Sequence, residues 1–269
     1  MMRRCAKLAF GLFLALALGV GAHAADLRVN GVDVHSDVAP RVIGGSTYVS
    51  LRAVTQALRG DAALSWEGQA VVRGSGITLT AAPGACYLEA NGRALYIANG
   101  IQAETGRLLV PVRVLAKALG AEVYWDAATG DVNIQSGSGT ITSGDAFYNA
   151  NDLYWLSHII SAESQGEPLV GKIAVGNVIL NRVKSDEFPN TIYDVIFDSA
   201  WGVQFTPVAN GTIYQEPTAE SVLAAKLCLD GANTAGSSLY FLAPALTNSR
   251  WAAQNRPYVT TIGAHQFYG

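Results

Sequence analysis

One stretch decides the fold of the C-terminal half of this 269-residue chain: Asp152-Leu-Tyr-Trp-Leu-Ser-His-Ile-Ile-Ser-Ala-Glu-Ser-Gln-Gly-Glu-Pro168. Its apolar residues recur every three or four positions, which is the spacing of an amphipathic helix face. Asn151 or Asp152 can cap the start of this helix, and Gly166 can end it. The stretch therefore predicts a helix whose apolar face comprises Leu153, Leu156, Ile159 and Ile160.

A second helix is predicted directly after the first. Pro168 is favoured in a first helical turn, and apolar residues at helical spacing continue through Val183 towards Asn190. We expect the two helices to pack against each other and to bury their apolar faces. Glu163 is the only charged residue on the apolar face of the first helix, so this carboxylate needs a specific explanation.

Two interpretations of Glu163 are open at this point. In the structural one, its carboxylate accepts a hydrogen bond from a backbone amide or pairs with Arg182. In the functional one, it is a general acid whose pKa is raised by partial desolvation and by the negative end of the helix dipole. Glu167, in contrast, is predicted to face solvent or to cap the following helix.

The N-terminal residues predict export. MMRRCAKLAFGLFLALALGVGAHA joins a basic segment to an apolar run and ends in the small-residue pattern Ala22-His23-Ala24. This pattern is typical of a secretory signal peptide, here residues 1–24, and an uncleaved N-terminal anchor is the alternative. We therefore expect a secreted protein that acts outside the cytoplasm, in the cell wall or a spore envelope.

Composition narrows the classes of partner. Without residues 1–24 the chain has 15 basic and 21 acidic side chains, so nucleic acid is excluded as a partner, because phosphate binding requires a basic surface. Hydrophobic residues make up 50% of the chain, which excludes a disordered protein. Only Cys86 and Cys228 remain in the mature chain, which excludes a disulfide scaffold and leaves a single bridge between them open.

A Gly/Ser/Thr segment at 136–145 predicts a flexible linker between two domains, residues 25–135 and 146–269. The first domain contains an internal repeat at a shift of 61 residues. Val29-Asn30-Gly31 matches Ala90-Asn91-Gly92, and Val49-Ser-Leu-Arg52 matches Val110-Pro-Val-Arg113. We read each copy as an Asn-Gly turn, a strand, a helix and a returning strand, which together predict one small α+β domain.

The repeat resembles a known domain. Its Asn-Gly turn, its Val-x-(Leu/Val)-Arg segment, the Ala-Leu-Gly helix end and Trp125-Asp126 resemble the copper amine oxidase N-terminal-like domain. The motif lacks metal ligands, so no copper is implied. The resemblance implies an extracytoplasmic stalk or adhesion module, with wall or envelope contact as its role.

The C-terminal half resembles the SleB-like, spore cortex-lytic family of cell-wall hydrolases. The resemblance rests on the opening stretch, on Val175-Gly-Asn-Val-Ile-Leu-Asn-Arg-Val183, and on later motifs that include Gln204-Phe-Thr-Pro207 and Leu239-Tyr-Phe241. It implies a lysozyme-like, mostly helical α+β domain with a short β-sheet, and a role in spore germination. It also implies cleavage of the glycan strands of peptidoglycan by a lytic transglycosylase, with Glu163 as catalytic acid and base and a 1,6-anhydro product.

Three further residues are candidates for substrate binding: Gln204, Phe205 and Tyr240. Amides bond sugar hydroxyls and aromatic rings stack on pyranose faces, although a buried aromatic or a backbone hydrogen bond would equally explain Phe205 and Tyr240. The segments 201–211 and 238–266, which we expect to form the cleft, contain no Asp or Glu. An ordinary glycosidase needs two carboxyl groups, so a cleft with one favours attack by the substrate's own hydroxyl.

No metal site and no cofactor are predicted. His158 and His265 have no zinc-ligand spacing, and packing roles are expected for both. Two other functions remain open: a non-catalytic envelope or wall-binding protein, and an amidase that cuts stem peptides. The amidase would need a metal or a nucleophile pair, which the sequence does not display.

Overall fold

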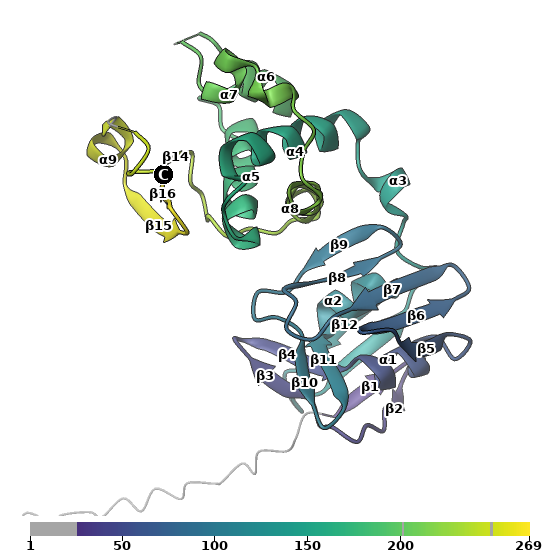
Figure 1. Ribbon diagram of the computed structural model, residues 1–269. Helices are drawn as coiled ribbons and strands as arrows, with labels where there is room; N and C mark the ends of the chain where they lie inside the picture. Colours follow the sequence, from purple (N-terminus) through teal and green to yellow (C-terminus); the bar gives the residue numbers. More distant parts are fainter. Residues whose placement is uncertain (1–25, 201, 248–249) are drawn as a thin grey trace, which may run out of the picture.

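The computed structural model describes residues 26–200, 202–247 and 250–269, and it has two domains connected through residues 136–145 (Figure 1). Its buried apolar side chains form three clusters, one in the first domain and two centred on the second. The first domain is rich in strands and the second is mostly helical, so the predicted α+β class is confirmed. The predicted signal peptide lies outside the described residues. Among the residues described, none of the helices has the length and apolar character needed to cross a membrane.

The N-terminal domain consists of two copies of one pattern, in which two hairpins precede a helix and one follows it. The first copy comprises β1 (Leu27–Val29), β2 (Val32–Asp33), β3 (Arg41–Ile43), β4 (Ser46–Ser50), α1 (Leu51–Leu58), β5 (Ala63–Trp66) and β6 (Ala70–Gly74). After β7 (Ile77–Ala81) the second copy follows: β8 (Tyr87–Ala90), β9 (Arg93–Tyr96), β10 (Gln102–Glu104), β11 (Arg107–Pro111), α2 (Val112–Ala118), β12 (Ala121–Trp125) and β13 (Val132–Ser136). The predicted repeat is confirmed, with more strands per copy than expected.

The Asn-Gly turns connect the two copies. Asn30 and Gly31 have φ angles of 52° and 80°, and Asn91 and Gly92 have 50° and 79°, as in the type I′ turns of tight hairpins. The Asn30 side chain donates to Ser136 Oγ at 2.8 Å, whereas Asn91 Oδ1 accepts from the Thr78 amide at 2.8 Å. The first turn is therefore fixed to the end of β13 in the second copy, and the second turn is fixed to β7, the strand that follows the first copy.

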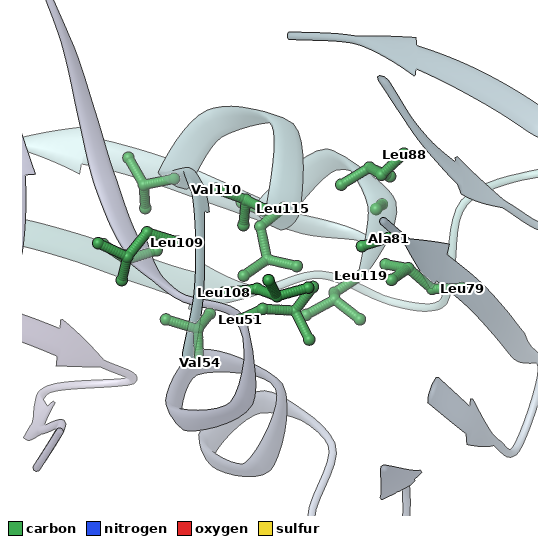
Figure 2. Close-up of a cluster of buried hydrophobic side chains, with 14 of the residues drawn as sticks. Leu51, Val54, Leu79, Ala81, Leu88, Leu108, Leu109, Val110, Leu115 and Leu119 are labelled. Carbon is green, nitrogen blue, oxygen red and sulfur yellow. The ribbon is translucent and has the colours of Figure 1, made fainter. Parts of the chain in front are cut away.

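A pseudo-twofold axis relates the copies. β4 and β11 pair antiparallel with Val49 opposite Val110, which is its own counterpart at the 61-residue shift. The strands form three sheets, in the orders β12-β13-β1-β2, β10-β11-β4-β3 and β5-β6-β7-β8-β9. Both helices contribute to one core between them, and Figure 2 shows Leu51 and Val54 of α1 facing Leu115 of α2 and Leu119 just after it. Neither copy has a core of its own.

The segment 136–145 is anchored to the first domain. Arg59 donates to the Gly139 carbonyl at 2.6 Å, the Thr140 hydroxyl donates to the Gly76 carbonyl at 2.7 Å, and Ile141 is buried. A Cβ on Gly137 would lie 2.3 Å from the Gly120 carbonyl oxygen, so this glycine permits close backbone contact. The segment predicted to be a flexible linker thus has its small residues packed against the first domain.

The second domain is built around three helices that pack on one another, α4 (Ala150–Ser164), α5 (Leu169–Val183) and α8 (Ala219–Leu229). α5 lies between α8 on one side and a small sheet of order β14-β16-β15 on the other (Figure 1). The remaining elements are α3 (Gly144–Phe147), α6 (Ile192–Phe197), α7 (Thr206–Asn210), the 3₁₀ turn η1 (Thr212–Tyr214), β14 (Tyr240–Leu242), α9 (Trp251–Asn255), β15 (Tyr258–Ile262) and β16 (His265–Tyr268). The predicted mostly helical domain with a short sheet is confirmed.

The two domains meet where β9 packs against α8 (Figure 1). Ala94 of β9 is completely buried in the core of the second domain. Next to it, Arg93 donates through Nε and Nη2 to the carboxylate of Asp230, whose side chain is 1% exposed. Tyr148 and Lys117 donate to the same carboxylate at 2.6 and 3.1 Å. Although burial acts to raise the pKa of Asp230, these hydrogen bonds hold it below its ordinary value, so the interface contains a charged carboxylate with three partners.

Candidate active site

Glu163 lies in the last turn of α4, close to where the sequence predicted it. The Asn149 side chain caps this helix and accepts from the amides of Asn151 and Asp152, so the helix begins earlier than either predicted cap. α5 begins after Pro168 and ends at Val183, well before Asn190, because Ser185 and Phe188 close turns that follow it. The predicted packing of α4 on α5 is observed.

The carboxylate of Glu163 is largely buried, and that burial raises its pKa to about 7 from an ordinary 4.5. Neither interpretation that made Glu163 structural is observed: within the described residues, its side chain has no hydrogen bond to a backbone amide and no ion pair with Arg182. A desolvated carboxyl group with no partner for its negative charge favours the protonated form. Glu163 therefore has the electrostatic setting of a general acid near neutral pH.

Glu163 opens into a cavity of about 1270 Å³ between α5, the loops that flank α6, and the small sheet. The three residues predicted to bind substrate, Gln204, Phe205 and Tyr240, all line this cavity together with Glu163. Gln204 is exposed, whereas Phe205 is 3% exposed and stacks on Phe241, so its ring forms part of the cavity floor. Segments far apart in the sequence thus meet in the cavity that contains Glu163.

The cavity also contains acidic residues that the sequence analysis missed, namely Asp186, Glu187 and Asp198. Asp186 and Glu187 lie between α5 and α6, and Asp198 directly follows α6, so all three lie outside the two segments expected to form the cleft. The expectation of a cleft with one carboxyl group is therefore wrong. Asp198 accepts a hydrogen bond from the Ala200 amide at 2.9 Å, and Glu187 accepts from Arg256 at 3.3 Å. Phe188 and Pro189, the next residues in the sequence after Glu187, also line the cavity, so this whole segment belongs to the site.

Tyr240, Trp251 and Arg256 form a platform on one wall of the cavity. The Arg256 guanidinium donates to the Tyr240 hydroxyl at 2.9 Å and lies 4.7 Å from the centre of the tyrosine ring. The rings of Tyr240 and Trp251 are 5.5 Å apart, edge to face. The platform offers aromatic faces and a cation side by side, which suits a sugar ring with polar substituents.

Arg182 lies beneath this platform rather than beside Glu163. Its Nε donates to the Leu239 carbonyl at 2.8 Å, and its guanidinium contacts the rings of Phe188, Phe205 and Tyr240. Burial lowers the pKa of Arg182 to about 10. This arginine therefore fixes β14 and the cavity floor to α5.

Glu167 is a structural carboxylate, and the prediction that it faces solvent or caps α5 is wrong. Its side chain is 11% exposed and accepts from the Ala264 amide at 2.9 Å, with His265 Nδ1 3.5 Å away. A Cβ on Gly263 would lie 1.8 Å from Glu167 Oε2, so the β15–β16 turn closes tightly over this carboxylate. Glu167 thereby joins the small sheet to the start of α5.

The two histidines have different surroundings. His158 is buried, its Nδ1 bonds to the Ile213 carbonyl at 2.8 Å, and its ring lies against Tyr154, in keeping with the expected packing role. His265 is buried beside Glu167 and lines the cavity. Among the described residues, His, Cys, Asp and Glu side chains do not gather into a group of three that could hold a metal ion. Cys86 and Cys228 are both free thiols, so the bridge left open between them is not formed.

Comparison with known families agrees with this division of the chain. Residues 166–268 match the family model described as Cell Wall Hydrolase. The C-terminal domain is therefore similar to the cell wall hydrolase family over these residues. The match of the hydrolase domain begins three residues after Glu163, so the role of this residue rests on its geometry. Residues 28–141 match the Copper amine oxidase N-terminal domain, which confirms the resemblance of the repeat.

Relatives of the hydrolase domain include the spore cortex-lytic enzymes of Bacillus cereus, 39% identical over 120 residues, and of Halalkalibacterium halodurans, 35% identical over 142 residues. These matches cover 45% and 53% of this chain and 45% and 41% of the relatives, so the chain spans about half the length of the curated relatives it matches. A solved structure, the catalytic domain of the germination-specific lytic transglycosylase SleB from Bacillus anthracis, is 37% identical, with a TM-score of 0.42. The comparison covers 48% of this chain and 100% of that one.

Proposed function

We propose that this protein is a lytic transglycosylase that cleaves the glycan strands of peptidoglycan, with Glu163 as its catalytic acid and base. The observation that carries the proposal is a largely buried carboxyl group, with a pKa of about 7, that opens into a large cavity. A carboxyl group with that pKa is protonated in a substantial fraction of molecules at neutral pH and can also accept a proton. The relatives, which include spore cortex-lytic enzymes and a lytic transglycosylase, support this reaction class.

The proton of Glu163 moves twice in the proposed reaction. First, the carboxyl group donates its proton to the glycosidic oxygen, and the bond between that oxygen and the anomeric carbon breaks. Then the carboxylate takes the proton of the 6-hydroxyl of the same sugar as its oxygen bonds to the anomeric carbon. The product carries a 1,6-anhydro ring, no water is consumed, and Glu163 regains its proton.

The walls of the cavity supply the sugar contacts in this proposal. The exposed Gln204 amide bonds sugar hydroxyl or acetamido groups, and the platform that includes Tyr240 stacks on a pyranose face. Phe205 acts from beneath, because its buried ring shapes the cavity floor. The cavity is lined by both acidic and basic side chains, which suits a largely uncharged glycan.

Asp198 is the reason to test the one-carboxylate mechanism directly. It lines the same cavity, and a second carboxylate could activate water or act as nucleophile, as in ordinary glycosidases. Its hydrogen bond from the Ala200 amide gives it a structural role in the loop after α6. We therefore propose Glu163, the cavity carboxyl group whose pKa burial raises to about 7, as the group that carries the chemistry.

The place of action follows from the substrate. Peptidoglycan lies outside the cytoplasm, so we propose that residues 1–24 direct export and that the enzyme acts in the cell wall or spore envelope. We also propose that the N-terminal domain contacts the wall or envelope and that the domain pair is carried to its substrate as one unit.

Product analysis tests the proposal. Purified sacculi, with and without muramic-δ-lactam, are digested by the wild type, by Glu163→Gln and by Asp198→Asn, with Glu216→Gln as an exposed control. We expect the wild type to leave 1,6-anhydro ends, detected by mass spectrometry. Glu163→Gln should lose at least ~10²-fold in rate, which is the scale of a general acid-base contribution. The other two variants should cleave at near-normal rates. Reducing ends together with an inactive Asp198→Asn would replace this mechanism with a two-carboxylate hydrolase, and a fully active Glu163→Gln would remove the assignment.

A further inference from the structure

A cluster of aromatic side chains lies on the second domain outside the cavity. It joins α4, α6 and η1, and we call it the α4–α6 aromatic patch: Tyr154, Trp155, Tyr193, Phe197 and Tyr214. The Trp155 ring is central, with ring centroids of Tyr154, Phe197 and Tyr193 at 4.9, 5.0 and 5.3 Å and that of Tyr214 at 6.2 Å. None of the five residues lines the cavity around Glu163.

The patch has a buried base and an exposed outer layer. Trp155 and Phe197 are half-buried and pack on the apolar core of the domain, which explains them as core residues. The three tyrosines are not explained in this way, because Tyr154, Tyr193 and Tyr214 are 48%, 43% and 63% exposed. Among the hydrogen bonds of the described residues, none involves a phenol hydroxyl of these three tyrosines. A contiguous patch of exposed aromatic side chains is typical of a binding site.

The charges near the patch indicate which kind of ligand it can bind. The charged residues beside it in the sequence are acidic, Asp152, Asp194 and Glu216, and no Lys or Arg occurs in 148–158, 190–198 or 208–218. Anionic polymers and lipid surfaces are therefore disfavoured. Exposed aromatic faces with free hydroxyls at their edges fit uncharged sugar rings, which present apolar C–H faces and polar rims.

The patch adjoins the cavity along two elements. Trp155 and Glu163 lie on the same helix, eight residues and roughly 12 Å apart along its axis. α6 carries Tyr193 and Phe197 and ends beside Asp198, which lines the cavity. The patch and the cavity are therefore linked through α4 and through the end of α6.

We propose that the α4–α6 aromatic patch is a second glycan-binding surface, which holds the uncharged N-acetylated sugars of a strand beyond the part held in the cavity. This inference rests on the proposed function, since it takes the occupant of the cavity to be a glycan polymer. The patch then contributes to the binding of long strands and not to the cleavage of short ones.

The test separates strand binding from chemistry. Tyr193→Ala/Tyr214→Ala is compared with Tyr258→Ala, a variant of a 60% exposed tyrosine on β15. Binding to insoluble sacculi is measured by co-sedimentation of the full chain carrying Glu163→Gln, and turnover of a soluble four-sugar glycan fragment is measured with Glu163 intact. We expect the double variant to bind sacculi about tenfold more weakly, the scale of losing two contact residues. Its fragment turnover, its melting temperature and every property of Tyr258→Ala should remain unchanged.

Several outcomes overturn the inference. Unchanged binding to sacculi removes it, and so does an equal loss of binding and fragment turnover, because the tyrosines would then support the catalytic fold. A self-association of the wild type that the double variant abolishes, with sacculus binding intact, would assign the patch to a second copy of the chain. If the wild type cleaves neither substrate, the proposed function fails, while the sacculus-binding comparison still decides the role of the patch.

Discussion

Replacing Arg93 by alanine should destabilise the whole chain, because this residue pairs the two domains across their interface. Arg93 and Asp230 are 8% and 1% exposed, and the arginine also lies over the Phe147 ring, 3.3 Å from its centroid. Breaking a buried ion pair by removing one partner costs about 3–5 kcal/mol. Lys117 and Tyr148 still donate to Asp230 in the variant, so we place the loss at the low end, about 3 kcal/mol.

The measurement is urea denaturation of the full chain followed by tryptophan fluorescence, where a loss of this size moves the midpoint by about 1 M or more. Arg73→Ala is the matched control, since Arg73 pairs with Glu67 in the same domain at an exposed site. Its midpoint should hardly move, because exposed ion pairs contribute little. An Arg93→Ala midpoint that moves no further than that of Arg73→Ala would show that the interface does not couple the domains.

Three further predictions concern the hydrolase domain. Because burial raises the pKa of Glu163 to about 7 in the folded state, the wild type loses stability from this group as pH rises from about 4.5 through 7. Glu163→Gln should therefore match the wild type near pH 4 and exceed it at pH 8 by up to about 3 kcal/mol in urea denaturation; equal stability at both pH values would contradict the burial argument. A fragment that begins at Thr142 should still cleave soluble glycan. Its melting temperature should fall by about 10 °C, because Asp230 loses its partners Arg93 and Lys117. A folded but inactive fragment would place part of the chemistry in the first domain. EDTA should leave the rate of glycan cleavage unchanged, as no metal-ligand cluster occurs among the described residues, and a loss restored by zinc would favour the amidase.

The repeat and Glu163 could be predicted from the sequence because both leave a periodic signal. Two copies of one pattern at a constant shift are visible without any structure, and one charge on an apolar helix face is visible from spacing alone. The short strands β2 and β3, in contrast, are too brief to show alternation.

The domain interface and the acidic edge of the cavity could not be predicted in the same way. Arg93 occupies the position of Val32 in the first copy, and its partner Asp230 lies 137 residues further along the chain. Nothing in the local pattern connects two such residues. Likewise, Asp198 enters the cavity only because α6 packs on α4 and α5, and the linker glycines were interpreted as flexible when they serve close packing.

Because Val49 pairs with its own counterpart Val110, the N-terminal domain is arranged like a homodimer whose two subunits are joined in one polypeptide. A single copy expressed alone would expose the β4 edge and half a core, and two such copies could satisfy each other by the same isologous contact. Because the two halves are joined in one chain, their sequences can differ. A substitution in one half is not repeated in the other, as it would be in a homodimer. Only the second copy carries an arginine at this position, so one half holds the second domain through Arg93 while the other completes the fold.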